Sequence, residues 1–169
     1  MKTVETGISG VKLITPDVFK DDRGFFKETF SSRRYAAAGI AETFVQDNVS
    51  FSVRNVLRGM HYDPRMSKLV QAVVGRIFDV VVDMREGSPT FKQWDGFELT
   101  GENHYQVFVP PGVAHGFLTL SDKAVVLYKQ TAVYDPQCER AIGWADPSVN
   151  IEWPLDGKAP LLSPKDAAL

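Results

Sequence analysis

Between Lys68 and Met84 the chain reads Lys68-Leu69-Val70-Gln71-Ala72-Val73-Val74-Gly75-Arg76-Ile77-Phe78-Asp79-Val80-Val81-Val82-Asp83-Met84. Two mostly apolar runs, Lys68–Val74 and Ile77–Met84, flank Gly75-Arg76, which is a turn signal. The second run is rich in β-branched residues, which is typical of a strand buried on both faces. The segment therefore predicts two strands that pair as a hairpin.

Similar short runs of β-branched and aromatic residues recur between turn signals along much of the chain. The further expected strands are Gly96–Leu99, Tyr105–Val109, Gly116–Leu120 and Val125–Thr131, with turns at Gly101-Glu102-Asn103 and Ser121-Asp122. Many short strands without alternating helices are typical of an antiparallel sandwich or barrel. The sequence thus predicts an all-β fold.

Only Ser31–Gly39 favours a helix. Ser31 or Ser32 can cap its start, and Gly39 can end it in a left-handed conformation; we expect this helix to lie on the surface. Residues 145–169 are rich in Pro and Asp, which predicts an irregular C-terminal arm fastened by large aromatic side chains. We expect residues 1–169 to form a single domain.

The composition limits the classes of partner. With 169 residues, of which 44% are hydrophobic and 24% charged, the chain can bury one good core. A formal charge of -2 argues against nucleic acid or an acidic membrane held by bulk electrostatics. Cys138 is the only cysteine, so no intrachain disulfide can form, and the N-terminus lacks the pattern of a signal peptide. No window approaches the roughly 18 consecutive apolar residues of a membrane span, and we expect a cytoplasmic protein.

The main chemical motif is Arg58-Gly59-Met60-His61-Tyr62, followed by Lys68 seven residues after the histidine. It brings a guanidinium, an imidazole and an amine onto neighbouring strand positions, which suits proton removal next to a carbonyl on an anionic substrate. A regular strand would put Arg58 and Met60 on one face and His61 on the other. Gly59 can mark a bulge that breaks this alternation.

These motifs, together with others over nearly the whole chain, resemble the dTDP-4-dehydrorhamnose 3,5-epimerases, a family of cupin-like barrels that act on nucleotide-linked 4-keto-6-deoxy sugars. The matching segments are Asp22–Glu28, Phe44–Asn48, Leu57–Tyr62, Lys68–Val70, Phe78–Val80, Asp83–Arg85, Ser88–Phe91, Pro111–Phe117, Leu127–Lys129, Tyr134–Pro136 and Ser163–Asp166. The resemblance implies a cupin-like jelly-roll β-barrel with one or two short helices. It also implies a homodimer with the N-terminal segment at the interface.

The resemblance further implies a role for each matching side chain. His61 would be the general base, Tyr128 the general acid on the other side of the sugar ring, Asp166 the carboxylate that orients His61, and Lys68 the group that faces the enolate. The implied substrate-binding residues, some contributed by a partner subunit, are Arg23, Glu28, Gln46, Asn48, Arg58, His115, Glu139 and Lys165.

The chemistry accounts for these residue types. A ketone at C4 acidifies the C–H bonds at C3 and C5, so one base, one enolate stabiliser and one proton donor on the opposite face can invert a centre. No redox cofactor is needed. A metal-dependent cupin would need clustered ligands such as His-x-His with a Glu nearby, whereas Tyr62 and Asp63 follow His61, so the sequence predicts no metal site.

Several of these residues also have a purely structural interpretation. His115 follows a turn, where its ring could tie down the loop through a backbone carbonyl. His104 follows the Gly101-Glu102-Asn103 turn and is expected to be exposed. Asp166, three residues from the end, has the composition of a solvated tail, and Tyr134 could form a wall of the pocket.

One local difference from the family concerns specificity. Relatives that invert two centres usually carry a glutamine two residues after the base and a longer connection to the lysine, whereas Asp63 stands here and residues 62–67 are short. Asp63 would meet Arg65 or Arg58, or the sugar would differ. The alternatives are an epimerase for one centre, an epimerase for another nucleotide-linked 4-keto sugar, a metal-dependent cupin, and a non-catalytic sugar-binding barrel.

Overall fold

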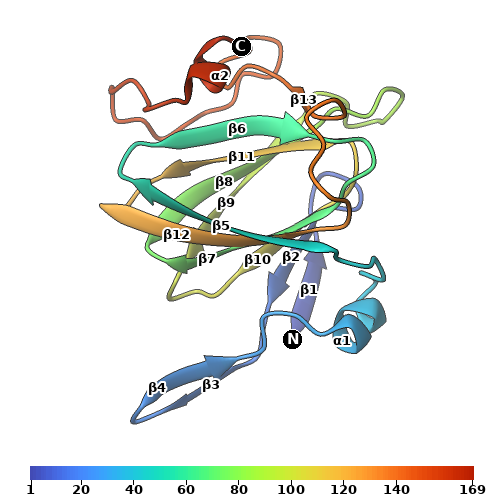
Figure 1. Cartoon of the computed structure of the whole chain (residues 1–169), viewed down its shortest axis with the longest axis vertical. Coiled ribbons are helices and arrows are strands. Elements are labelled where there is room, and N and C mark those ends of the chain that lie inside the picture. The colour runs from blue at the N-terminus through green and yellow to red at the C-terminus, as the bar shows by residue number, and fades with distance from the viewer.

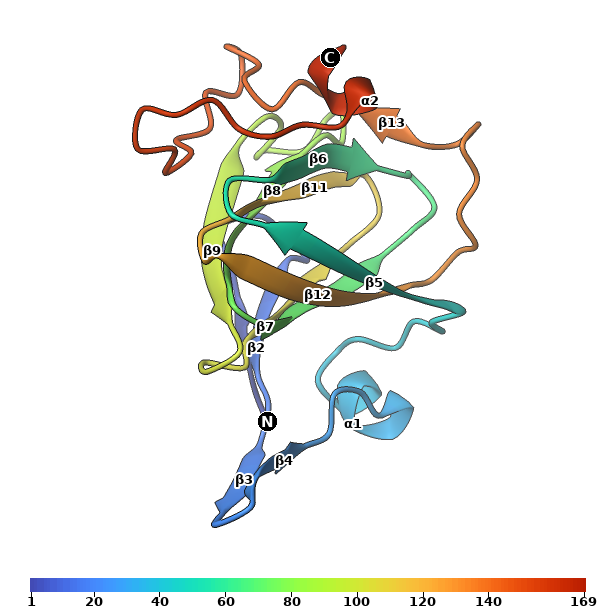
Figure 2. The same cartoon turned by 60° about the vertical axis from the view of Figure 1, so that its left-hand side comes forward.

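The computed structural model describes residues 1–169 and consists almost entirely of antiparallel strands in two facing sheets (Figures 1 and 2). The first sheet has the order β1 (Lys2–Glu5), β2 (Lys12–Thr15), β10 (Gln106–Val109), β7 (Lys68–Val74), β12 (Lys123–Gln130) and β5 (Gln46–Val53). The second has the order β13 (Arg140–Ala141), β6 (Leu57–Tyr62), β11 (Val113–Thr119), β8 (Arg76–Asp83) and β9 (Trp94–Thr100). The predicted all-β, cupin-like jelly-roll barrel is confirmed.

The two strands in the segment from Lys68 to Met84 form as predicted, but the hairpin between them is wrong. β7 pairs with β10 and β12, whereas β8 pairs with β9 and β11. The chain crosses from one sheet to the other at Gly75, which has a φ of 77°. Each apolar strand therefore has two neighbours in its own sheet, and the two strands lie in facing sheets instead of pairing edge to edge.

The main core lies between the sheets. It contains Val70 and Val126 from the six-stranded sheet and Ile77, Val81 and Leu99 from the five-stranded sheet, all almost fully buried. Inward-facing residues of both sheets fill this layer, as in other two-layer β folds. Beyond it, β5 and β12 lie opposite β6 and β11, and Figure 2 shows these strands enclosing the open side of the barrel.

A second core covers the outer face of the six-stranded sheet. Helix α1 (Ser32–Ala37) lies within the predicted range, and Gly39 follows it in the left-handed conformation, with a φ of 78°. Ser31 occupies the N-cap position but makes no side-chain hydrogen bond there. The helix lies on the surface as expected, with five of its six residues exposed, and Tyr35 anchors it by packing against Ile14, Leu69 and other core residues.

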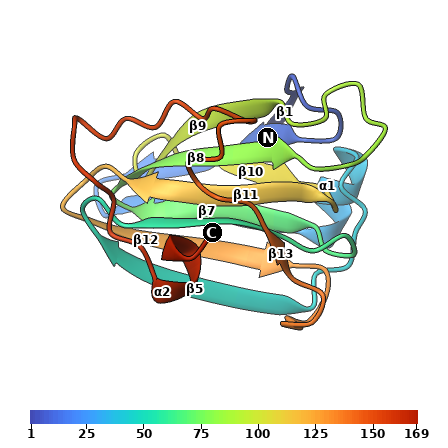
Figure 3. The ribbon, with the colours of Figure 1, turned by 90° about the horizontal axis from the view of Figure 1, so that it is seen from above.

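The C-terminal segment covers the outer face of the five-stranded sheet, and Figure 3 shows it crossing over these strands. Val149 joins Met60, Val80 and Ala114 in a third core, with Trp153 packed against it. The segment ends in a single-turn helix, α2 (Pro164–Ala167). Neither helix, of six and four residues, is long enough to cross a membrane.

An N-terminal hairpin of β3 (Val18–Asp21) and β4 (Gly24–Lys27), which we call the arm, projects away from the barrel (Figure 1). It exposes several phenylalanines, among them Phe26. The predicted exposure of His104 is wrong, because Phe25 of the arm packs on its ring with 4.6 Å between ring centroids. His104 is consequently only 4% exposed.

Candidate active site

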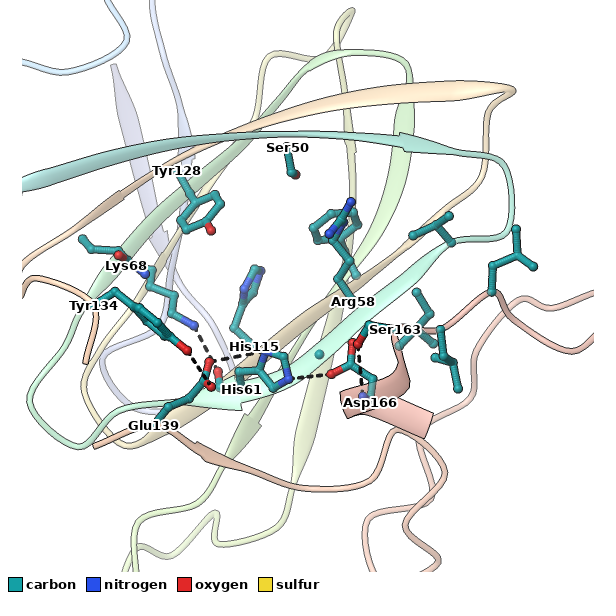
Figure 4. Close-up of a pocket in the computed structure, with 17 residues that line it drawn as sticks. Ser50, Arg58, His61, Lys68, His115, Tyr128, Tyr134, Glu139, Ser163 and Asp166 are labelled. Carbon is teal, nitrogen blue, oxygen red and sulfur yellow. Dashed lines mark hydrogen bonds and ion pairs between the residues drawn. The ribbon is translucent and has the colours of Figure 1, made fainter. Parts of the chain in front are cut away.

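A cavity of about 460 Å³ opens between β5 and β12 on one side and β6 and β11 on the other (Figure 4). The C-terminal segment closes part of its rim through residues 161–163 and Asp166. The predicted site residues that line it are Arg58, His61, Lys68, His115, Tyr128, Glu139 and Asp166. Residues from distant parts of the sequence thus meet in one chamber, as is usual for a binding site.

His61 lies at the end of β6, between two carboxylates. Nε2 of His61 lies 2.7 Å from Oδ1 of Asp166, and Nδ1 lies 3.7 Å from Oε1 of Glu139. Asp166 is only 4% exposed, and its backbone N–H donates to Oγ of Ser163, the N-cap of α2, at 3.1 Å. A carboxylate on Nε2 fixes the tautomer and leaves Nδ1 as the atom that can accept a proton.

Lys68 extends from β7 toward the same histidine. Its Nζ donates to the backbone carbonyl of His61 at 3.0 Å. Burial lowers the pKa of Lys68 to about 8, although the charges of Glu139, Asp79 and Asp63 oppose this shift. The amine is therefore still mostly charged at neutral pH, in a position where a developing negative charge would be strongly stabilised.

Tyr128 lies on β12, across the cavity from His61 (Figure 4). Burial is the main cause that raises the pKa of Tyr128 above its ordinary value. The phenol is consequently protonated at neutral pH, and it has no hydrogen-bond partner within the chain. It can therefore supply a proton from the face opposite to His61.

The strand alternation breaks at Gly59. Arg58 and His61 both line the cavity, whereas Met60 is buried on the outer side with Val80. The pairing of β6 with β11 shifts register here, and a Cβ on Gly59 would lie 2.6 Å from Cα of Gly116. The bulge that Gly59 suggested is thus present, and it brings the guanidinium and the imidazole into one chamber.

His115 faces His61 directly in the register of β11 and β6. Its Nε2 lies 2.7 Å from Oδ2 of Asp79, so the ring pairs with a carboxylate and not with a backbone carbonyl. Asp79 is fully buried on β8 and was not among the predicted site residues. The sequence signal for it was a carboxylate inside an otherwise apolar buried strand.

Three further predicted binding residues do not line the cavity but contact residues at its border: Gln46, Asn48 and Lys165. Glu139 accepts hydrogen bonds from the hydroxyl of Tyr134, which also lines the cavity, and from the ammonium of Lys165. Gln46 donates to Asn48, and Asn48 donates to the cavity residue Gln130. These residues form two polar groups bordering the chamber.

Arg23 and Glu28 lie outside the cavity of their own chain. Arg23 is at the tip of the arm, with its side chain 90% exposed and 2.6 Å from Asp21. Glu28 follows the arm and pairs with Arg34 at 3.3 Å. A single chain therefore does not bring these two predicted binding residues to the site.

The partner of Asp63 is Arg65, at 2.8 Å, and not Arg58. This guanidinium holds the pKa of Asp63 below its ordinary value. Asp63 is only 4% exposed, and Arg65 compensates its charge within the short connection between β6 and β7. No group of three or more His, Cys, Asp or Glu side chains is arranged to hold a metal ion.

A jelly-roll barrel with a histidine and a tyrosine on opposite walls of its cavity is the architecture expected of the cupin-like sugar epimerases, which are isomerases. Within that class the chain belongs to the dTDP-4-dehydrorhamnose 3,5-epimerase family, whose family model matches residues 5–169.

Individual relatives agree with this membership. The chain is 51% identical over 170 residues to the dTDP-4-dehydrorhamnose 3,5-epimerase of Neisseria gonorrhoeae, covering 99% of this chain but only 52% of that protein, so it spans about half of that relative's length. It is 52% identical to the enzyme of the same name from Pseudomonas aeruginosa, covering 98% of this chain and 93% of that protein. The crystal structure of an epimerase from Legionella pneumophila in complex with dTDP-4-keto-L-rhamnose superposes with a TM-score of 0.95 at 48% identity, over 99% of this chain and 90% of that one.

Proposed function

We propose that the chain converts dTDP-4-dehydro-6-deoxyglucose to dTDP-4-dehydrorhamnose by inverting C3 and C5 of the sugar. The observation that carries this proposal is the His61–Asp166 pair in the same cavity as Lys68 and Tyr128. The names of the relatives support the choice of substrate, and the pairing of Asp63 with Arg65 removes one reason to expect a different sugar.

Each inversion takes two proton transfers. Nδ1 of His61 removes the proton from C3 or C5, the C–H electron pair forms a carbon–carbon double bond to C4, and the carbonyl π electrons move to the C4 oxygen. The Lys68 ammonium stabilises this enolate. Tyr128 then gives its proton to the same carbon from the opposite face, and solvent returns a proton to the phenolate as His61 releases the one that it took.

A second part of the proposal concerns assembly. On the edge strand β5, the inward side chains of Asn48, Ser50 and Ser52 are polar, whereas Val49 and Phe51 point outward and are 69% and 58% exposed. A solvent-facing strand normally has the reverse pattern, and an uncovered apolar edge strand is a liability. We infer that a second copy of the chain covers this face.

The arm suits such a homodimer. Its exposed Phe25 and Phe26 match an apolar partner surface, and Arg23 at its tip is too far along the arm to reach its own cavity (Figure 1). In the dimer, Arg23 and Glu28 of one protomer would complete the other's binding site, where a guanidinium fork suits a pyrophosphate. The lone Cys138 and the small net charge are consistent with a cytoplasmic enzyme that binds neither nucleic acid nor membrane.

Incubation of the wild type and His61→Ala with dTDP-4-dehydro-6-deoxyglucose tests the catalytic proposal, with products analysed by NMR. We expect the wild type to form the epimerised sugar and His61→Ala to form none, while both bind dTDP with affinities within about threefold. Absence of conversion by the wild type, or full conversion by His61→Ala, would contradict the proposal.

A further inference from the structure

Two aspartates of β8, Asp79 and Asp83, are completely buried, and their surroundings differ. Asp83 accepts hydrogen bonds from Arg85, Ser88 and Thr90, which satisfy both of its oxygens. Asp79 has one partner only, His115, and its Oδ1 is buried without any partner. Asp83 therefore has the contacts of a residue that fixes a loop, and Asp79 does not.

The buried position of Asp79 lowers the stability of the fold, so stability does not explain why an aspartate stands there. Its neighbours Phe78, Val80 and Val81 are apolar, and a buried carboxylate with one oxygen unpaired destabilises the fold relative to an apolar side chain at the same place. Such a cost persists where the group serves another purpose. The partner, His115, lines the cavity.

The contact with Asp79 decides which ring nitrogen of His115 is free to bind a ligand. Since Nε2 contacts the carboxylate, Nδ1 is the ring nitrogen left for a ligand. Nδ1 has no hydrogen-bond partner in the chain, and it is not fully buried. His115 stands opposite His61 in the strand register. The cavity thus holds two neighbouring histidine–carboxylate pairs, each with an N···O distance of 2.7 Å.

We propose that Asp79 is a positioning residue that holds His115 with its Nδ1 toward the cavity, so that His115 serves as a second hydrogen-bond donor, beside Lys68, to the C4 oxygen of the substrate. In this role His115 is an imidazolium, whereas His61 acts as a neutral base: His115 gives Nε2–H to Asp79 and Nδ1–H to the oxygen that becomes negative when His61 removes the C–H proton. The imidazolium stays intact throughout, so no further proton changes place. This inference rests on the proposed epimerase function.

A double-mutant cycle tests whether Asp79 acts through His115. We expect Asp79→Asn to lower kcat about 10- to 100-fold and His115→Asn to lower it about 100- to 1000-fold, with KM changed less than about threefold, because a donor to developing charge acts in the transition state. The double variant should lose no more than His115→Asn alone. Multiplicative losses would overturn the positioning role.

A second measurement does not depend on turnover. In ¹⁵N-histidine NMR spectra we expect a slowly exchanging Nε2–H signal from His115 in the wild type that is lost or shifted upfield in Asp79→Asn. An unchanged signal would overturn the proposal even if activity fell. Conversely, a wild type that shows this signal but converts no 4-keto sugar would refute the proposed function and not the Asp79–His115 pairing.

Asp83→Asn is the matched control, because it neutralises the other fully buried carboxylate of the same strand. We expect it to lower the melting temperature by several degrees while kcat per folded molecule and the His115 signal stay within about twofold of the wild type. If Asp83→Asn and Asp79→Asn instead lowered kcat equally and left the His115 signal unchanged, both aspartates would be structural and the proposal would fail.

Discussion

The positive charge of Lys68 is needed for the proposed catalysis but lowers the stability of the fold. Because its folded-state pKa of about 8 lies below the ordinary 10.5, the charged form that the enolate needs is destabilised by burial. We expect Lys68→Met to lower kcat about 100- to 1000-fold. The same variant should raise the free energy of unfolding by ~1–2 kcal/mol at pH 7. Equal or lower stability in urea unfolding would contradict the assigned burial cost.

The sign of the pH dependence follows from the same pKa. Between pH 8 and 10.5 the unfolded chain holds more protons at Lys68 than the folded one, so this residue's destabilising effect is complete below pH 8 and disappears toward pH 10.5. The activity should change in the opposite direction as the pH rises. We expect kcat/KM to fall as the pH rises through about 8, and the residual activity of Lys68→Met to lack that decline. A decline retained in Lys68→Met would assign it to another group.

A substitution of Tyr128 can distinguish proton removal from the later return of a proton on the opposite face. If it supplies the second proton, Tyr128→Phe should slow net epimerisation more than it slows exchange of the substrate C–H with solvent, because His61 can still remove and return a proton on its own face. Comparing deuterium incorporation with product formation in the same sample measures both. Equal losses in the two rates would argue against Tyr128 as the acid.

At the residue scale the sequence indicated most of the side chains that line the candidate site, but it did not indicate Asp79 behind His115. His61, Lys68 and Arg58 could be selected from their chemistry and spacing, because they lie close together in the sequence. Asp166 lies 105 residues from His61, so only the family resemblance indicated it. Asp79 was hidden because a lone buried carboxylate reveals its role only through its partner, and His104 was wrongly predicted because the arm that covers it comes from a distant segment.

At the scale of elements, the single-turn helix α2 is what brings Asp166 to His61. Oγ of its N-cap Ser163 accepts the backbone N–H of Asp166 at 3.1 Å. We expect Ser163→Ala to weaken this turn by about 1 kcal/mol and to lower kcat about fivefold without changing the melting temperature of the barrel by more than about 2 °C. Asp166→Asn with Ser163 intact should cost more. Wild-type kcat in Ser163→Ala would show that Asp166 is held by other contacts.

The crossing between β7 and β8 shows why element order was predicted better than pairing. The apolar pattern of residues 68–84 predicts that both strands are buried, and this pattern is contained in the local sequence. Which strands become neighbours depends on β10, β11 and β12, which begin more than 20 residues later. A glycine with positive φ serves a hairpin turn and a sheet crossing equally well, so Gly75 could not distinguish them.

At the scale of the whole molecule, we expect the arm of one chain to complete the cavity of another. Arg23→Ala and His61→Ala should each be poorly active alone, Arg23→Ala by about 10- to 100-fold in kcat/KM. Refolded together in equal amounts, they should regain about a quarter of wild-type activity, because about half of the dimers are mixed and each mixed dimer has one intact site. No gain on mixing would place Arg23 in its own chain's site or outside any site.

The dimer itself is testable separately. Phe51→Lys puts a charge on the apolar outer face of β5, where Phe51 is 58% exposed in one chain. We expect light scattering to give twice the mass of one chain for the wild type and a mass shifted toward one chain for Phe51→Lys. Glu98→Lys, a substitution at an exposed position of β9 in the other sheet, should leave the mass unchanged. A wild type of single-chain mass would contradict the homodimer.

Proton NMR in D₂O of dTDP-4-dehydro-6-deoxyglucose with the wild-type protein, following deuterium at C3 and C5 separately, tests directly whether His61 removes a proton beside the C4 ketone. We expect exchange at both positions with accumulation of the rhamnose epimer, and no exchange with His61→Ala. Exchange at one position alone would make the chain an epimerase for a single centre. No exchange at either position would contradict the assignment of this cavity to proton transfer beside the C4 ketone.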